Sequence, residues 1–94
     1  MAAQRLSEEA IGAELRDVAW EREGDEIVKK VVRRDFKEAM VFVNRVADLA
    51  EARAHHPDIS ISWNTVGLRL STHSSGGLTA LDFELARAVD ALGS

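Results

Sequence analysis

The chain has 94 residues, of which 46% are hydrophobic and 30% charged, and its net charge is −4. This length supports one domain with a single hydrophobic core, which we assign to residues 1–94. The absence of cysteine excludes disulfides, thiolate metal ligands and a cysteine nucleophile, and the acidic net charge without a long basic run argues against a nucleic-acid partner.

The first predicted elements are a helix and a hairpin. Ser7 can cap a helix that ends near Arg16, because a serine hydroxyl accepts a hydrogen bond from a free amide of the first turn. Residues 19–23 and 27–34 are expected to pair as strands, since the second segment is rich in β-branched residues and Gly24-Asp25 suits the turn between them. Trp20 should anchor the first strand in the core.

A second helix is expected after Asp35, which has capping-box spacing with Glu38. It should run about five turns, to residues 52–54, and pack across the sheet. The apolar face expected to be buried consists of Phe36, Ala39, Met40, Val43, Val46, Ala47 and Ala50.

A second hairpin is expected after Pro57, which disfavours helix at the preceding residue. Isoleucines and Trp63 alternate with serines over residues 59–63, the pattern of a half-buried strand. Trp63 is therefore assigned to the core, with a surface for stacking a flat ring as the alternative. The turn is expected at Asn64-Thr65, and residues 66–71 alternate as the returning strand.

The third helix is expected after Thr79, with Asp82 at capping-box spacing and Gly76-Gly77 as a hinge before it. A catalytic acid at Asp82 and an anion-binding nest at the glycine pair are the alternatives. The element order α-β-β-α-β-β-α predicts an α+β fold, a four-stranded antiparallel sheet with helices packed on one face. The other face of the sheet must be wet, paired with another subunit or part of a site.

All three histidines lie between residues 51 and 73. A regular hairpin would return His73 toward His55 and His56, on the sheet face of Arg69 and away from the core, while Glu51 lies one helical turn before His55. Imidazoles titrate near neutral pH, and close imidazoles resist simultaneous protonation, so one can act as a base and another as an acid. The cluster predicts acid–base catalysis; a three-histidine metal site and a polar loop with surface imidazoles are the alternatives.

The segment E-A-R-A-H-H-P, followed by Trp63, Thr72-His73 and Asp82, resembles the signature of the pterin-4a-carbinolamine dehydratases. The resemblance covers about residues 5–92. Ala54, Arg33 and Arg34 depart from the usual family pattern. The further matching positions are Trp20, Asp35-Phe36, Val46-Ala47, Ala50-Glu51, Leu70-Ser71 and Gly77-Leu78-Thr79.

The resemblance implies the dehydration of a 4a-hydroxytetrahydropterin to a quinonoid dihydropterin, in tetrahydrobiopterin recycling, with neither metal nor cofactor. His55 and His73 would transfer protons at the hydroxyl, His56 would position the pterin or accept the ring proton, and Glu51 would orient an imidazole. The residues expected to bind substrate are Pro57, Trp63, Ser71, Thr72, Ser74 and Asp82.

The resemblance also implies a homodimer or homotetramer. Some relatives stabilise the dimer of a transcription factor, so a non-catalytic protein-interaction module is the alternative function. The N-terminus lacks the apolar core of a signal peptide, and the longest apolar run, residues 39–43, is too short to span a membrane. We therefore expect no membrane partner and a cytoplasmic location.

Overall fold

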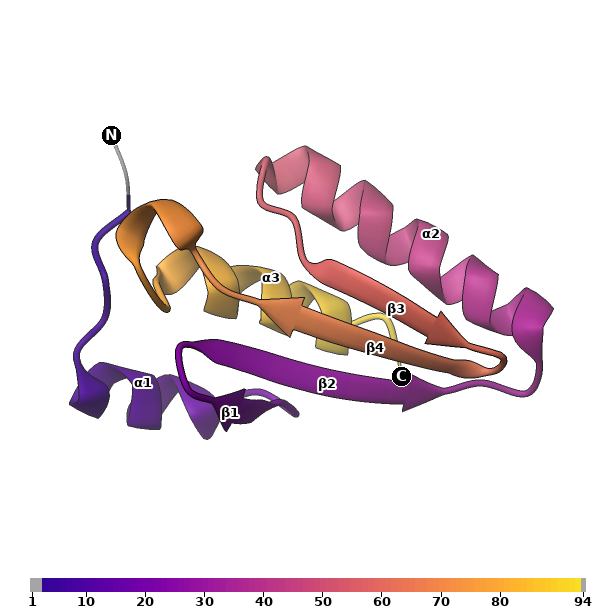
Figure 1. Ribbon diagram of the computed structural model, residues 1–94, viewed down its shortest axis with the longest axis horizontal. Coiled ribbons are helices and arrows are strands. Elements are labelled where there is room, and N and C mark those ends of the chain that lie inside the picture. Colours follow the sequence, from indigo (N-terminus) through magenta and orange to yellow (C-terminus); the bar gives the residue numbers. More distant parts are fainter. Residues whose placement is uncertain (1–2, 94) are drawn as a thin grey trace.

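The computed structural model describes residues 3–93 and confirms the predicted α+β class and element order (Figure 1). A short 3-10 helix, η1 (His73–Ser75), adds one element that the sequence pattern does not predict. The other elements are α1 (Glu8–Leu15), β1 (Glu21–Glu23), β2 (Glu26–Val32), α2 (Phe36–Arg53), β3 (Asp58–Ser62), β4 (Thr65–Leu70) and α3 (Ala80–Asp90).

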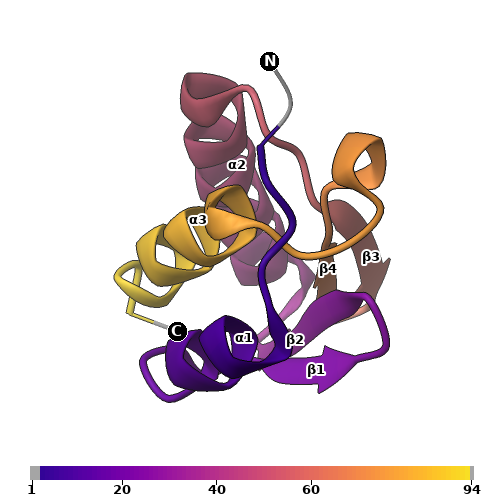
Figure 2. The ribbon, with the colours of Figure 1, turned by 90° about the vertical axis from the view of Figure 1, so that its left-hand side faces the viewer.

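The four strands form one antiparallel sheet in the order β1-β2-β4-β3, so β4 lies inside the sheet and β3 at its edge. All three helices lie on one side of this sheet (Figure 2). The apolar residues of β2 and β4 that face the helices are at most 4% exposed, and burying such side chains provides the main stabilisation of the fold. These residues are Ile27, Val31, Val66, Leu68 and Leu70.

The predicted caps of all three helices are present. The Ser7 hydroxyl accepts from the amide of Ala10 at 3.1 Å, and the Asp35 carboxylate accepts from the amide of Glu38 at 2.9 Å. Thr79 and Asp82 form the expected capping box at the start of α3. Each cap satisfies amides that have no partner within the helix, and thereby fixes where that helix begins.

Trp20 anchors the entry to β1, as predicted, and is 6% exposed. Its indole N–H donates to Oδ1 of Asp90 at 2.9 Å, and Nζ of Lys29 donates to the same oxygen at 2.9 Å. Because Asp90 ends α3, this cluster fastens the C-terminal end of that helix to the first hairpin.

The assignment of Trp63 to the core is wrong. Trp63 is 66% exposed, has a left-handed backbone conformation with φ 51°, and occupies the turn together with Asn64, so the turn begins one residue earlier than predicted. The prediction of a half-buried strand at β3 is also wrong, since all five of its residues are exposed. The alternation of apolar and polar residues shows which side chains share one face of a strand, but not whether that face is covered. Because β3 lies at the edge of the sheet, the helices do not fully cover its apolar face.

The predicted buried face of α2 is confirmed at Ala39, Val46 and Ala50 and is wrong at Phe36. Phe36 is 51% exposed, whereas Phe42, which the pattern did not select, is 3% exposed and lies beneath the guanidinium of Arg33 at 4.6 Å from the ring centroid. The fully buried stripe is Ala39, Phe42, Val46 and Ala50, spaced by three and four residues. Met40, Val43 and Ala47 lie at its margin and are partly exposed.

Candidate functional site

The end of α2 determines where the two adjacent histidines lie. Ala54 takes a left-handed conformation, with φ 50°, and terminates the helix immediately before His55. The amide of His55 still donates to the carbonyl oxygen of Ala50 at 3.2 Å, which ties the segment to the last helical turn. Pro57 then leads the chain into β3. This sharp exit holds His55 and His56 between a helix end and a sheet edge.

His55 makes a close contact with a carboxylate from the third helix. Its Nε2 lies 2.6 Å from Oδ1 of Asp82, a short hydrogen bond to a carboxylate acceptor. The side chain of His55 is 11% exposed and that of Asp82 is fully buried. The contact joins residues 27 positions apart and forms only when the start of α3 packs against the end of α2.

Two threonines complete the surroundings of the buried carboxylate. Oδ2 of Asp82 accepts from the hydroxyl of Thr72 and from the amide of Thr79, both at 2.9 Å. The two threonine hydroxyl oxygens lie 2.8 Å apart. Thr72 and Thr79 are 5% and 0% exposed, so this is a buried network in which each side-chain oxygen has a partner.

His56 has a separate and exposed partner. Its Nε2 lies 2.5 Å from Oε2 of Glu51, while the two side chains are 59% and 77% exposed. The expected contact between Glu51 and an imidazole is therefore present, and it is made to His56. Because water surrounds this pair, Glu51 constrains the imidazole of His56 less than the buried carboxylate of Asp82 constrains the imidazole of His55.

His73 lies in η1 and is exposed, because β4 ends at Leu70 and does not continue to His73 as a regular strand. Between residues 3 and 93 no hydrogen bond or ion pair joins His73 to His55 or His56, so their convergence stays a prediction. His73 instead lines an open hollow of about 260 Å³. The other lining residues are Asp25, Glu26, Ser71, Gly76 and Gly77.

The remaining predicted binding residues do not form one group. Pro57 directly follows the histidine pair, Thr72 contacts Asp82, and Ser74 is exposed in η1. Trp63 lies beyond the far end of β3, about 20 Å from the histidine segment at 3.3 Å per strand residue. The structure therefore does not bring Trp63 to the histidines.

Within residues 3–93, no group of three or more His, Asp or Glu side chains could hold a metal ion. The three-histidine metal site thus has no geometric support in this part of the chain. Over the same residues, no helix combines the length and apolar character needed to cross a bilayer.

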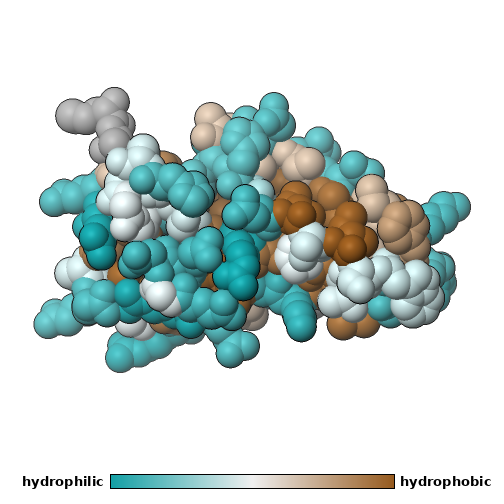
Figure 3. All heavy atoms as spheres, viewed as in Figure 1, coloured by the Kyte–Doolittle hydropathy of each residue, from teal (hydrophilic) through white to brown (hydrophobic). Residues whose placement is uncertain are grey.

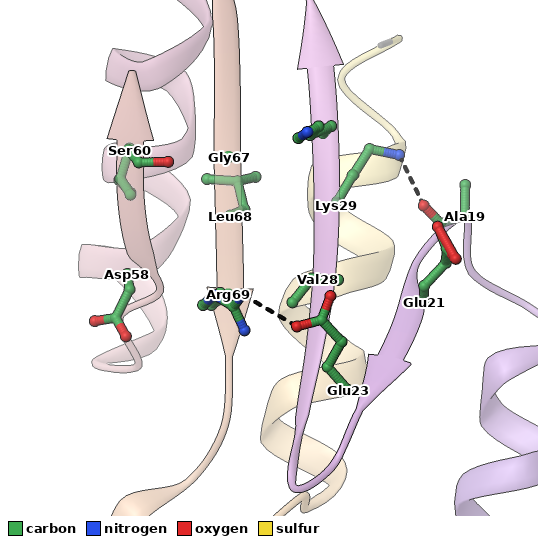
Figure 4. Close-up of a pocket in the computed structure, with 12 residues that line it drawn as sticks. Ala19, Glu21, Glu23, Val28, Lys29, Asp58, Ser60, Gly67, Leu68 and Arg69 are labelled. Atoms are coloured by element: carbon green, nitrogen blue, oxygen red, sulfur yellow. Dashed lines mark hydrogen bonds and ion pairs between the residues drawn. The ribbon is translucent and has the colours of Figure 1, made fainter. Parts of the chain in front are cut away.

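A larger hollow, of about 570 Å³, lies on the sheet face opposite the helices and was not predicted (Figure 4). Gly67 forms part of its floor, and a Cβ there would lie 2.5 Å from Oγ of Ser60. Arg69 pairs with Glu23 at 3.1 Å and with Glu26 at 3.0 Å, and these hydrogen bonds raise the pKa of its guanidinium. No histidine lines this hollow. Charged residues recur at alternate positions of the strands in the sequence, and this pattern could have predicted a polar face on this side of the sheet.

Two bacterial relatives match nearly the whole length of this chain. A protein of Thermomicrobium roseum, provisionally named a pterin-4-alpha-carbinolamine dehydratase, is 50% identical over 96% of this chain and 98% of its own. A Nocardia farcinica protein with the same provisional name is also 50% identical, over 98% of both chains. High identity across the whole length makes the comparison valid for every element of the fold.

Solved structures agree with this relationship. A transcriptional coactivator/pterin dehydratase from Brucella melitensis superimposes with a TM-score of 0.91 at 32% identity, covering 97% of this chain and 100% of that chain. A pterin dehydratase-like RuBisCO assembly factor of the alpha-carboxysome has a TM-score of 0.65 at 23% identity, over 82% and 90% of the two chains, and shows the fold alone. The family model of pterin 4 alpha carbinolamine dehydratase matches residues 4–92. The chain therefore belongs to the pterin 4 alpha carbinolamine dehydratase family.

Proposed function

We propose that this protein dehydrates 4a-hydroxytetrahydropterin to quinonoid dihydropterin in tetrahydrobiopterin recycling. The observation that carries the proposal is His55, an imidazole held at 2.6 Å by a fully buried carboxylate beside a second histidine. An ordered imidazole is what acid–base catalysis requires, because proton transfer depends on a fixed position relative to the substrate.

The reaction needs two proton transfers. An acid protonates the 4a-hydroxyl as the C4a–O bond breaks and water leaves, and a base takes the ring N–H proton, so the net change is the loss of one water. We assign His55 and His73 to the hydroxyl and His56 to the ring, with Glu51 orienting His56. The bond from His56 to Glu51, at 2.5 Å, supports the last of these roles.

The test is stopped-flow dehydration of freshly generated 4a-hydroxytetrahydropterin, with chelator present throughout. The wild-type protein is expected to exceed the spontaneous rate, and His73→Ala to lower kcat/KM by about 10²-fold, the lower end of the usual range, because His73 is exposed. Lys37→Ala, at an exposed position of α2, is the control and should match the wild type. A folded wild-type protein with no acceleration would remove the dehydratase assignment for this substrate.

We also propose that the protein forms a homodimer through β3. Of the two sheet edges, β1 is short and charged, whereas β3 has no Lys, Pro or bulge to prevent pairing. An apolar patch lies over the β3 side of the molecule (Figure 3). The exposed large apolar residues in β3 and the turn that follows it are Ile59, Ile61 and Trp63. A second copy would bury this patch and pair the edge.

Sedimentation velocity tests the dimer. Ile61→Lys is expected to shift the wild-type dimer to a monomer, because it places a charge within the apolar patch beside the paired edge, while circular dichroism stays unchanged. Ala13→Lys, on the exposed side of α1, is the matched control and should sediment as the wild type does. If the wild type is a monomer at high concentration, the patch is available to a different protein, as the coactivator alternative requires.

A further inference from the structure

We infer that Asp82 holds His55 in the tautomer with the proton on Nε2, which leaves Nδ1 as the nitrogen that exchanges a proton with the substrate. The first half of this inference depends only on the buried hydrogen-bond network. The second half rests on the proposed dehydratase function. Together they make Asp82 a positioning residue that acts through His55.

The donors and acceptors around Asp82 determine the tautomer. Oδ2 is occupied by two donors, the Thr79 amide and the Thr72 hydroxyl, each at 2.9 Å. Oδ1 faces Nε2 of His55 at 2.6 Å. An ionised carboxylate only accepts hydrogen bonds, so Nε2 must carry the proton and donate it. In the part of the chain that the structure describes, no hydrogen bond is found at Nδ1 of His55.

The threonines prevent the carboxylate from rotating out of this arrangement. The Thr72 hydroxyl has one proton and donates it to Asp82, so Thr79 must donate its own hydroxyl proton to Thr72. The Thr79 oxygen in turn accepts from the amide of Leu81 at 3.2 Å. The chain of hydrogen bonds thus has one direction from Thr79 to Oδ2, and Oδ1 is left for His55.

This asymmetry predicts the effect of an amide at position 82. In Asp82→Asn, the carbonyl oxygen must replace Oδ2, because two donors point at that position. The amide NH₂ then faces His55 and donates to Nε2, which forces the imidazole proton to Nδ1. The helix cap survives, since the Thr79 amide keeps an acceptor, while the tautomer is reversed.

The exposed pair of Glu51 and His56 supplies a matched control. No donor is bound to the second oxygen of Glu51 within residues 3–93, so Glu51→Gln can rotate and present its carbonyl to Nε2 of His56. The same chemical change is therefore expected to reverse the tautomer at the buried pair and to leave it unchanged at the exposed pair.

The experiment is ¹⁵N NMR of the histidine side chains at a pH where the imidazoles are neutral, because protonated and unprotonated ring nitrogens have widely separated shifts. We expect the Nε2–H form of His55 in the wild type, the Nδ1–H form in Asp82→Asn, and an unchanged His56 in Glu51→Gln. An Nδ1 proton in the wild type, or an Nε2 proton retained in Asp82→Asn, would overturn the inference.

Kinetics then test the second half. Asp82→Asn is expected to lower kcat by about 10²–10⁴-fold, as loss of the correct tautomer does in a serine protease triad. Thr72→Val removes a buried hydroxyl from the same network but keeps the carboxylate, so His55 should stay in the Nε2–H form. A wild type without dehydratase activity would refute the proposed function while the tautomer measurement still stood. An active Asp82→Asn with a reversed tautomer would refute the catalytic half alone.

Discussion

His55→Ala is expected to lower kcat/KM for the dehydration by about 10³–10⁴-fold, the upper part of the range for a positioned acid–base group. His55 is the best ordered of the three imidazoles, since it is 11% exposed and bonded to a fully buried carboxylate. The measurement is stopped-flow kinetics with a concentration series of the hydroxylated pterin, so that kcat and KM are separated.

The alanine also leaves Asp82 buried with one donor missing, which costs about 1–3 kcal/mol of folding free energy. His55→Gln is the matched variant, because its side-chain amide can donate to Oδ1 and restore that hydrogen bond without supplying a group that titrates near neutral pH. The two variants should therefore differ in stability and agree in lost activity. If His55→Gln retained more than about a tenth of the wild-type rate, His55 would not be the proton-transfer group.

Phe83→Ala is expected to reduce the free energy of unfolding by about 3–5 kcal/mol, because it leaves a cavity in the core. Phe83 is 0% exposed and lies on α3 next to Asp82. Domains of this kind have a total stability of about 5–15 kcal/mol, so the variant will approach partial unfolding at moderate temperature. Urea denaturation monitored by circular dichroism measures the difference.

Phe36→Ala removes the same side chain from a site that is 51% exposed and should cost less than about 1 kcal/mol. The comparison therefore separates the structural core from the apolar face predicted by periodicity. Equal losses at the two positions would mean that Phe36 is covered in solution, which association of two copies would explain.

The sequence predicted well those features that depend on neighbouring residues. The caps at Ser7, Asp35 and Thr79 involve partners within three positions, and the element order depends on local patterns of apolar residues. The exposure of Ile59 and Ile61 depends on β3 lying at the sheet edge, which is a property of the strand order, whereas Trp63 is exposed because it lies in the turn after β3. The spacing of apolar residues along the chain contains no information about strand order, so the prediction of a half-buried strand at residues 59–63 failed.

The candidate site was predicted in its residue types but not in its pairings. Glu51 and His56 lie on adjacent parts of the chain, and their contact was within reach of a local argument. The network from Thr72 through Asp82 to His55 joins the end of α2, the segment after β4 and the start of α3. The capping-box spacing predicted the partner of Oδ2 of Asp82, which is the amide of Thr79. The partner of Oδ1 is His55, and it depends on the packing of α3 against the end of α2.

The double attachment of Asp82 has a consequence for protein engineering. Asp82 is at N3 of the capping box of α3, a position where either a carboxylate or a side-chain amide oxygen can accept a hydrogen bond from the N-cap amide. Here the carboxylate caps α3 with one oxygen and holds an imidazole with the other. Stability screens would rank Asn as an acceptable substitute at this position, so thermostabilised libraries need position 82 to be fixed as aspartate from the outset.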